Sequence, residues 1–538
     1  MGDRGWRWTD AHFCSLPSQT NVYGLTRITD SEGNNKLLVA SLDGKVIAVE
    51  YQTFNNRLTP CTKEIQFTYI PGDAEIVSVD VLRRCQGNNG IIVGITFLKL
   101  QEDEKECKPA SQFLNLYSAS EVGDEANLDI VAQGCLSLEL NFIPYQLLHT
   151  ELLDDDSKEM VFLLSGGDNK IHMYRESFKS HGFQETPSEE FFPEFNNIPS
   201  SVLQLSISYL DNYKRRLTVM GHQNGLVQVA YVNVTAKEVL ISWSTEHDSP
   251  ITSIRLFTAK NHVACPSFLD FFNEESAREE EEQLANYNLL VTSALEPAVV
   301  YRNVLITGFE DILSLPNSEK FDSTLCSCVV DIDFDGENEL LVGTYGQELL
   351  AYKYFEENQH FDTDRKYSLS DITIKAGSSQ SNTPSHTSST PERTLNQLEE
   401  LNKQRHRSDE SNSQATSVKD AQPTRKAKSQ EDLFVSGHGV KEEQVQLEED
   451  VQPPFNPAGF QLLWQRSFPG PVVGLDRLDI MGDGMDDLVV VTLKGMHILQ
   501  PDLGEVAEVC RERLRGLCDS SSEPDDAYHN LQKETFGR

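Results

Sequence analysis

The sequence is poor in positive charge. Its 46 lysines and arginines stand against 84 aspartates and glutamates, which leaves a formal net charge of −38. A protein that binds the phosphates of nucleic acids or an anionic membrane surface needs clustered cations. The composition therefore argues against both kinds of partner, while its 38% of hydrophobic residues are enough for a large core in a chain of 538 residues.

Long apolar runs are also absent. No window approaches the roughly 18 uninterrupted apolar residues of a membrane-spanning helix. The first residues, MGDRGWRWTDAHFCSLPS, lack the apolar region of a secretion signal. The sixth residue is Trp6 and the last four are TFGR, so neither end carries a lipidation motif. We expect a soluble intracellular protein without direct membrane insertion.

Motifs for metal binding and catalysis are missing as well. The ten cysteines form no CxxC motif and no Cys/His pair at zinc spacing, so we expect reduced, mostly buried thiols. There is no GxSxG elbow, no HExxH motif and no Walker loop; SGGDNK at 165–170 lacks the GxxxxGK spacing. We expect no enzyme, no catalytic residues and no organic cofactor.

What the sequence does contain is one repeated pattern, an apolar run closed by a small residue. It occurs seven times, at Leu37–Ala40, Ile91–Gly94, Phe162–Ser165, Thr218–Gly221, Leu289–Thr292, Leu340–Gly343 and Val489–Thr492. Several copies continue through a turn into a second strand, as Asp43-Gly44 does before KVIAVEY. The first six copies are 51 to 71 residues apart, slightly more than in WD-type blades. Such runs are typical of strands that are covered on both faces.

We therefore predict an all-β fold, a single seven-bladed β-propeller, because radial closure removes exposed sheet edges. Several unrelated antiparallel sheets are the alternative. The predicted parts are an N-terminal tail at 1–17, blades 1 to 6 at 18–355, an insertion at 356–454, blade 7 at 455–502, and a C-terminal region at 503–538. In the last part, Gly504–Leu517 has the composition of a short helix packed on the ring edge, followed by a polar tail.

The insertion explains the last step between copies, which is 149 residues long. It is rich in polar residues and poor in aromatics, so it cannot offset its chain entropy, and we predict disorder between blades 6 and 7. It contains four candidate phosphorylation sites: Thr383 and Thr390 precede prolines, and Ser408 and Ser429 follow basic residues. We expect phosphates there to change partner choice without touching a core.

An acidic loop is the candidate metal site. Asp331, Asp333 and Asp335 alternate, and Glu339 follows at the ninth position, directly before an apolar run. An EF-hand requires a glutamate at the twelfth position, which is Val342 here. The spacing instead resembles the Asp-x-Asp-x-Asp-Gly-x-x-(Asp/Glu) loop of integrin-type FG-GAP blades. This resemblance implies FG-GAP-like blades in the propeller and calcium on Asp331, Asp333, Asp335 and Glu339. The alternative is that these carboxylates only bond the backbone amides of a tight turn.

A weaker copy of this loop runs from Asp479 to Asp487. Met481 stands there in place of the middle carboxylate. A thioether is a poor ligand for calcium, so we expect metal in this second loop less than in the first.

Specific stretches of the sequence matter more here than its pattern. They are QTNVYG at 19–24, KEIQFTYIPGDAEIVSVD at 63–80, IIVGITF at 91–97, LEPAVVYRN at 295–303, GTYGQELLAYKY at 343–354, LLWQRSF at 462–468 and LKGMHILQ at 493–500. Together these stretches resemble the kaptin family. They occur in order between about residues 18 and 500, and leave out only the insertion and both tails.

The resemblance implies a non-catalytic scaffold subunit of the lysosome-associated KICSTOR complex. That complex helps to recruit the GATOR-type GTPase-activating complex, so that mTOR signalling falls when amino acids or glucose are scarce. The implied partners are the other KICSTOR subunits, among them an FG-GAP propeller protein and a very large scaffold subunit. The implied location is cytoplasmic and peripheral on the lysosomal membrane, through partners.

The alternative function that the resemblance suggests is direct binding to actin filaments in lamellipodia and stereocilia. Actin filaments are acidic, so their ligands usually present a basic surface. The net charge of −38 therefore favours the scaffold.

Overall fold

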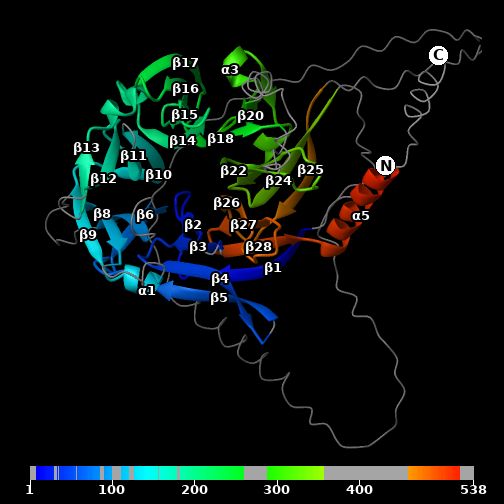
Figure 1. Ribbon diagram of the computed structural model, residues 1–538, viewed down its shortest axis with the longest axis horizontal. Coiled ribbons are helices and arrows are strands. Elements are labelled where there is room, and N and C mark those ends of the chain that lie inside the picture. Colours follow the sequence, from blue (N-terminus) through cyan, green and yellow to red (C-terminus); the bar gives the residue numbers. More distant parts are fainter. Residues whose placement is uncertain are drawn as a thin grey trace, which may run out of the picture. The chain divides into compact units, whose positions relative to one another are not determined.

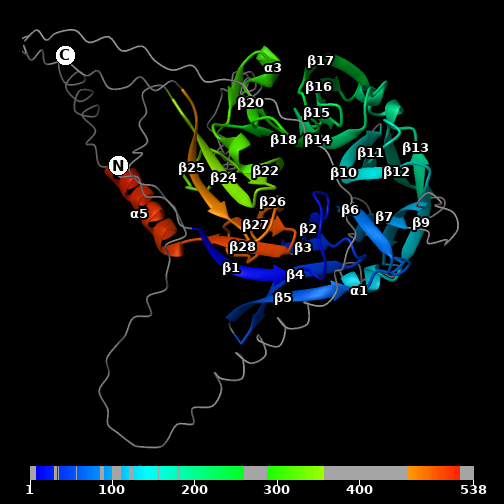
Figure 2. The same cartoon turned by 180° about the vertical axis from the view of Figure 1, so that it is seen from behind.

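A computed structural model describes residues 8–29, 33, 35–55, 57–84, 90–99, 111–119, 127–154, 157–177, 182–259, 287–356 and 458–520. In these ranges, seven four-stranded sheets are arranged as the blades of a ring (Figure 1, and from behind in Figure 2). The prediction of an all-β, seven-bladed propeller is confirmed.

The blades follow the chain, each from its innermost to its outermost strand. Blade 1 consists of β2 (Leu25–Thr29), β3 (Asn35–Ala40), β4 (Val46–Phe54) and β5 (Arg57–Ile65), and blade 2 of β6 (Ala74–Arg83), β7 (Ile91–Lys99), β8 (Ser111–Ser118) and β9 (Cys135–Leu140). Blade 3 consists of β10 (Pro144–Asp154), β11 (Ser157–Gly166), β12 (Ile171–Ser177) and β13 (Gly182–Thr186), and blade 4 of β14 (Val202–Leu210), β15 (Arg215–His222), β16 (Leu226–Asn233) and β17 (Glu238–Glu246). Blade 5 consists of β18 (Ile251–Thr258), β19 (Tyr287–Ser293), β20 (Val299–Tyr301) and β21 (Ile312–Ser314), and blade 6 of β22 (Thr324–Val330), β23 (Glu339–Thr344), β24 (Glu348–Phe355) and β25 (Gly459–Ser467). Blade 7 consists of β26 (Val472–Leu478), β27 (Asp487–Thr492), β28 (Gly495–Pro501) and β1 (Trp8–Ser15).

Each of the seven apolar runs forms the second strand of a blade. This strand is covered on both faces by the neighbouring blades, which is why its residues are apolar in succession and do not alternate with polar ones. Leu341 of β23 and Val490 of β27 are both fully buried and belong to one apolar cluster. The core of the ring therefore lies between blades, in layers that join each sheet to the next.

The first strand of the chain closes the ring. β1 pairs with β28 in an antiparallel register from Trp8 opposite Pro501 to Ser15 opposite Gly495. The prediction of an N-terminal tail at 1–17 is therefore wrong for residues 8–15. β1 is an outermost strand whose residues are mostly exposed, so it needs no apolar run that could have marked it in the sequence.

A second boundary also needs correction. β25 pairs with β24, with Gly459 opposite Phe355, so β25 completes blade 6. The predicted blade 7 at 455–502 therefore begins one strand too early. The described chain stops at Glu356 and resumes at Ala458. The remainder of the predicted insertion, with Thr383, Thr390, Ser408 and Ser429, lies outside the described residues.

Helices are few in the part of the chain that the structure describes. α1 (Leu128–Val131) and α3 (Val304–Thr307) are single turns in blades 2 and 5, and α5 (Leu503–Ser520) follows β28. α5 confirms the predicted C-terminal helix and is slightly longer at both ends than predicted. No helix within the described ranges has both the length and the apolar character needed to cross a bilayer.

Candidate functional site

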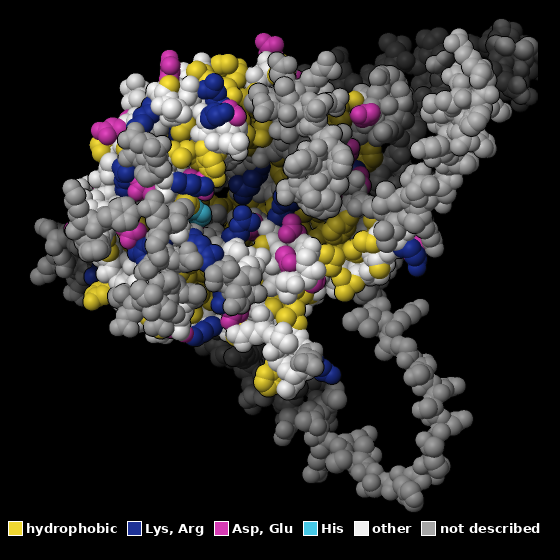
Figure 3. Space-filling view, viewed as in Figure 1, with side chains coloured by type: hydrophobic (Ala, Val, Ile, Leu, Met, Phe, Trp, Pro, Cys, Tyr) yellow, Lys and Arg dark blue, Asp and Glu magenta, His cyan; other side chains and the backbone are white. Residues whose placement is uncertain are grey.

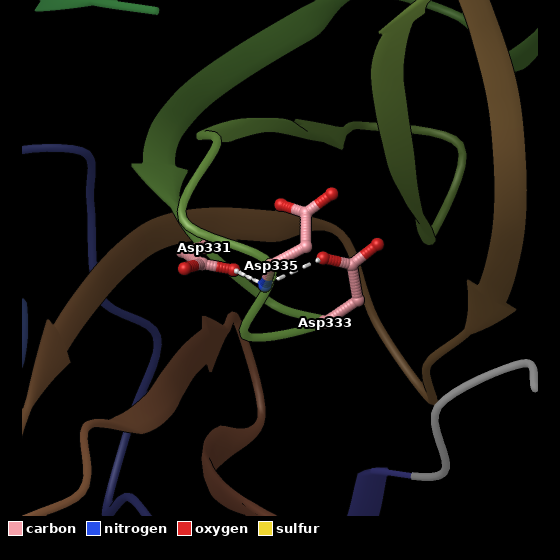
Figure 4. Close-up of side chains that lie close together, drawn as sticks. All are labelled: Asp331, Asp333 and Asp335. Atoms are coloured by element: carbon pink, nitrogen blue, oxygen red, sulfur yellow. Dashed lines mark hydrogen bonds between the residues drawn. The ribbon is translucent and has the colours of Figure 1, made fainter. Parts of the chain in front are cut away.

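The acidic loop joins β22 to β23 in blade 6. Carboxylate oxygens of Asp331, Asp333 and Asp335 lie within 4.8 Å of one another. Figure 4 shows the carboxylates of Asp331 and Asp333 on two sides of the backbone amide of Asp335. The tight turn needs positive backbone φ angles, which are 56° at Phe334 and 94° at Gly336; the glycine adopts its angle without steric cost. The spacing therefore brings the three aspartates together as predicted.

The aspartates bond the backbone of their own loop. Asp331 accepts hydrogen bonds from the amides of Asp335 at 3.0 Å and Gly336 at 2.9 Å, one on each carboxylate oxygen. Asp335 in turn accepts the amide of Glu337 at 2.9 Å. These are the bonds that the alternative of a tight turn requires.

The last predicted ligand, Glu339, is the first residue of β23 and is fully buried. One of its carboxylate oxygens accepts the amide of Ile332 at 2.8 Å. The other lies 2.7 Å from the Nζ atom of Lys353 on β24. The same ammonium lies 2.6 Å from Asp333 Oδ2 and 2.6 Å from Asp335 Oδ2. Lys353 is thus at the centre of the site.

Lys353 was missed by the sequence analysis. The strand register contains the signal that identifies it. Leu340 lies opposite Tyr352 in the antiparallel β23–β24 pair, so the residue opposite Glu339, one position earlier on β23, is Lys353. A basic residue directly across a ladder from the last acidic residue of the loop is a recognisable signal, but only once both strands and their register have been assigned.

Electrostatics in the site follow from burial. Burial raises the pKa of Glu339 and the nearby charge of Asp333 adds to this effect, while the ammonium of Lys353 opposes it. Burial also raises the pKa of Asp333 to about 6, against the opposing influence of Lys353. Burial disfavours the charge on Lys353, but the carboxylates outweigh it and raise the pKa of the ammonium. The lysine therefore stays charged among carboxylates that outnumber it.

Calcium requires six to eight oxygen ligands at about 2.3 to 2.6 Å. Three of the four predicted ligands here are bonded to the ammonium of Lys353, and both oxygens of the fourth, Asp331, accept backbone amides. The side chains as they lie fit an ammonium group and do not fit a calcium ion. Calcium binding by this loop stays a prediction.

The weaker loop in blade 7 has the same architecture. Asp479 accepts the amides of Gly482 at 2.6 Å and Gly484 at 2.7 Å, and Asp487 accepts the amide of Ile480 at 3.1 Å. Gln500 of β28 donates to Asp487 at 3.0 Å. The register of the β27–β28 pair gives Gln500 the position that Lys353 has in blade 6. Blade 7 therefore places a neutral amide where blade 6 places a cation.

The acidic loop of blade 6 also contacts both neighbouring blades. Trp8 of β1, in blade 7, donates from its indole Nε1 to the carbonyl of Ile332 at 3.3 Å. Asn338 donates from its side chain to the carbonyl of Thr258, in blade 5, at 2.9 Å. The loop therefore connects three consecutive blades, and its conformation matters for how they are held together.

Basic side chains occur on the innermost strands even though the chain is acidic. Arg27 is on β2, Arg255 on β18 and Arg477 on β26. Arg255 donates to the carbonyl of Ser327, on the next innermost strand, at 3.0 Å. Figure 3 shows Lys and Arg side chains gathered near the middle of the face that it presents. Some of the relatively few basic side chains therefore lie around the centre of the ring.

The fold and the site together define a seven-bladed β-propeller with acidic turn loops that are held by hydrogen bonds. A family model for "KICSTOR complex protein kaptin" matches residues 8–377 and 446–511 of the chain. A protein of the same description from Mus musculus is 36% identical over 503 residues, which are 94% of this chain and 90% of the mouse protein. The chain belongs to the kaptin family.

Proposed function

We propose that the chain is a non-catalytic scaffold subunit of a KICSTOR complex. The observation that carries the proposal is the extent of the match to the mouse protein, which covers 94% of this chain and 90% of the relative. The residues matched by the family model, 8–377 and 446–511, include every described strand of the ring, from the closing strand β1 to β28.

The finer function follows from the resemblance to the family. The chain would help to recruit a GATOR-type GTPase-activating complex and so lower mTOR signalling when amino acids or glucose are scarce. Its ligands would be other KICSTOR subunits, including an FG-GAP propeller protein and a very large scaffold subunit. Its place on the lysosomal membrane would be peripheral and depend on those partners.

One apolar surface at the rim of the ring supports a role in docking. Ile241 and Trp243 are two residues apart on β17, so their side chains project from the same face of the strand. A Cβ atom at Gly308, directly after α3, would lie 2.6 Å from the Trp243 indole, so the residue that ends α3 packs against β17. Ile241 is 48% exposed and Ile306 of α3 is 66% exposed. We call this surface the β17–α3 edge.

The proposal is tested by purifying the tagged full-length chain from cells under mild salt, with mass spectrometry of the bound proteins. A filament co-sedimentation assay on the isolated chain runs in parallel. Stoichiometric recovery of KICSTOR subunits without sedimentation supports the scaffold. Saturable binding of actin filaments by the isolated chain, with no stable partner in the purification, would contradict the proposal and favour the actin alternative.

Variants locate the docking surface. The double variant Ile241→Glu with Ile306→Glu should reduce partner recovery while leaving the melting temperature nearly unchanged, because both side chains are exposed. Phe54→Glu is the matched control, since Phe54 is 70% exposed and lies at the end of β4 in blade 1, whereas the β17–α3 edge belongs to blades 4 and 5. Equal recovery from all three proteins would show that partners dock elsewhere on the ring.

A further inference from the structure

We propose that Lys353 supplies the cation of the Asp331 loop, so that this loop keeps its calcium-type conformation without binding a metal. The inference concerns how blade 6 is stabilised and does not rest on the proposed function.

Each N–H donor of the Lys353 ammonium has a carboxylate acceptor in the loop. A lysine has three N–H donors, and this one has three carboxylate partners, at 2.6 Å from Asp333, 2.6 Å from Asp335 and 2.7 Å from Glu339. Bonds between charged groups at this distance are short and strong. The lysine therefore holds together the three carboxylates that a calcium ion would otherwise have to gather.

Burial makes the cation necessary. The side chain of Lys353 is 12% exposed and that of Glu339 is fully buried. A buried carboxylate next to other carboxylates is unfavourable unless it gains a proton, a metal or an opposite charge. The geometry of β24 delivers the opposite charge, because its register with β23 places Lys353 across from Glu339.

Blade 7 provides an internal comparison. The amides of Asp483 and Gly484 bond Asp479 as those of Asp335 and Gly336 bond Asp331, and the last carboxylate again accepts an amide, but Met481 replaces the middle carboxylate. In the same blade, neutral Gln500 takes the position of Lys353 and donates to Asp487 at 3.0 Å. The loop of blade 6, which has the additional carboxylate of Asp333, is paired with a lysine, and the loop of blade 7, which lacks it, is paired with a neutral amide. In these two blades, the residue across from the last carboxylate is charged only where the additional carboxylate is present.

The test is the thermal stability of the full-length chain in EDTA and in millimolar calcium. The wild-type chain should melt at the same temperature in both, because its cation position is filled. Lys353→Met keeps the apolar stem and removes the charge. It should melt at least about 3 °C lower in EDTA, and calcium should restore about half of that loss or more by mass action. Adding Asp333→Asn to Lys353→Met should abolish the restoration.

Two further variants control the experiment. Lys45→Met removes a lysine that is 45% exposed and lies 3.9 Å from Glu64, so it should change neither the melting temperature nor its response to calcium. Lys353→Gln copies blade 7 and retains a donor, which provides a milder variant if Lys353→Met does not fold; it should show the same calcium response with a smaller loss.

Two outcomes would overturn the inference. Saturable stabilisation of the wild-type chain by calcium would show that the loop binds metal in spite of Lys353, and this arm does not depend on any variant folding. Destabilised Lys353 variants that gain nothing from calcium would show that the lysine does not occupy a position where calcium could bind.

Discussion

The indole of Trp8 donates a hydrogen bond to the carbonyl of Ile332, across 324 positions of the sequence. Trp8 is only 4% exposed and packs in the apolar cluster that joins blades 6 and 7. Its own carbonyl accepts a hydrogen bond from Arg466 of β25 at 3.0 Å. The first strand of the chain is thus held by its own blade and also by the blade before it.

Replacing Trp8 by alanine should destabilise the ring by about 3 to 5 kcal/mol, because a large buried aromatic side chain is removed from a packed layer. Chemical denaturation of the full-length chain measures the change. Phe54→Ala is the control: Phe54 is 70% exposed at the end of β4, and its loss should cost no more than about 0.5 kcal/mol. Similar losses for the two variants would show that ring closure does not depend on Trp8.

The residues between β24 and β25 should be dispensable for the fold. Phe355 and Gly459 are directly opposite each other in the β24–β25 pair, so the two strand ends are already adjacent and a short turn can join them. We expect a chain in which a linker of about six glycines and serines replaces 357–457 to melt within a few degrees of the full-length protein. A larger drop in calorimetry would mean that the replaced residues pack on the propeller.

Removing Glu194 should be costly because it leaves a buried charge without its partner. Glu194 lies in η2 (Pro193–Phe195) and accepts two hydrogen bonds from Arg216, each 2.9 Å long, and one from Thr218 at 2.7 Å. The side chains of Arg216 and Glu194 are 2% and 1% exposed. Glu194→Ala should therefore lower the free energy of unfolding by about 3 to 5 kcal/mol.

Two comparisons check that explanation. Replacing both Glu194 and Arg216 by methionine removes the unpaired charge, so the double variant should be more stable than Glu194→Ala. Breaking the exposed pair of Lys214 and Asp211, whose side chains are 68% and 45% exposed, should cost about 0 to 1 kcal/mol. A double variant as unstable as Glu194→Ala would indicate that packing, and not the unpaired guanidinium, explains the loss.

His149 should make the ring slightly more stable at lower pH. Its Nδ1 lies 2.8 Å from Asp80 Oδ2, between blades 3 and 2. Burial lowers the pKa of His149, but the Asp80 carboxylate outweighs burial, and the pKa is raised above its usual 6.5. A raised pKa in the folded state adds stability that is fully present below the unfolded pKa and is lost as pH rises through the folded pKa.

The pH effect is measured by denaturation at about pH 5.5 and about pH 8.5, on either side of the ordinary histidine pKa. The stability difference between wild type and His149→Gln should be larger at the lower pH. It should stay below about 1 kcal/mol, because the side chain of His149 is 39% exposed. Asp80→Asn should remove the same pH dependence. A difference that grows with pH would contradict the assigned pairing.

The seven second strands could be predicted from the sequence because burial on both faces gives a run of apolar residues, as in Leu340–Gly343. The outermost strands could not, since they are covered on one face only. β1, which begins at Trp8, and β25, which begins at Gly459, are mainly half-buried or exposed. Both errors in the predicted boundaries, the tail at 1–17 and the start of blade 7 at 455, fall on these strands.

The same contrast holds for the site. The positions of Asp331, Asp333, Asp335 and Glu339 follow from a local spacing, and the structure brings them together. Lys353 belongs to the next strand, and only the strand register relates it to Glu339. Local spacing therefore identified the acidic half of the site, whereas the basic half depends on how two strands pair.

The pairing of β1 with β28 has a consequence for synthesis on the ribosome. Asp10 of β1 bonds His497 of β28, 487 positions later. At about 5 to 20 residues per second, translation of that interval of 487 positions takes about 25 to 100 s. During this time the N-terminal strand has left the ribosomal exit tunnel without its partner. The nascent chain must therefore keep β1 free to pair, and must avoid aggregation through this unpaired strand, until the last blade has been translated.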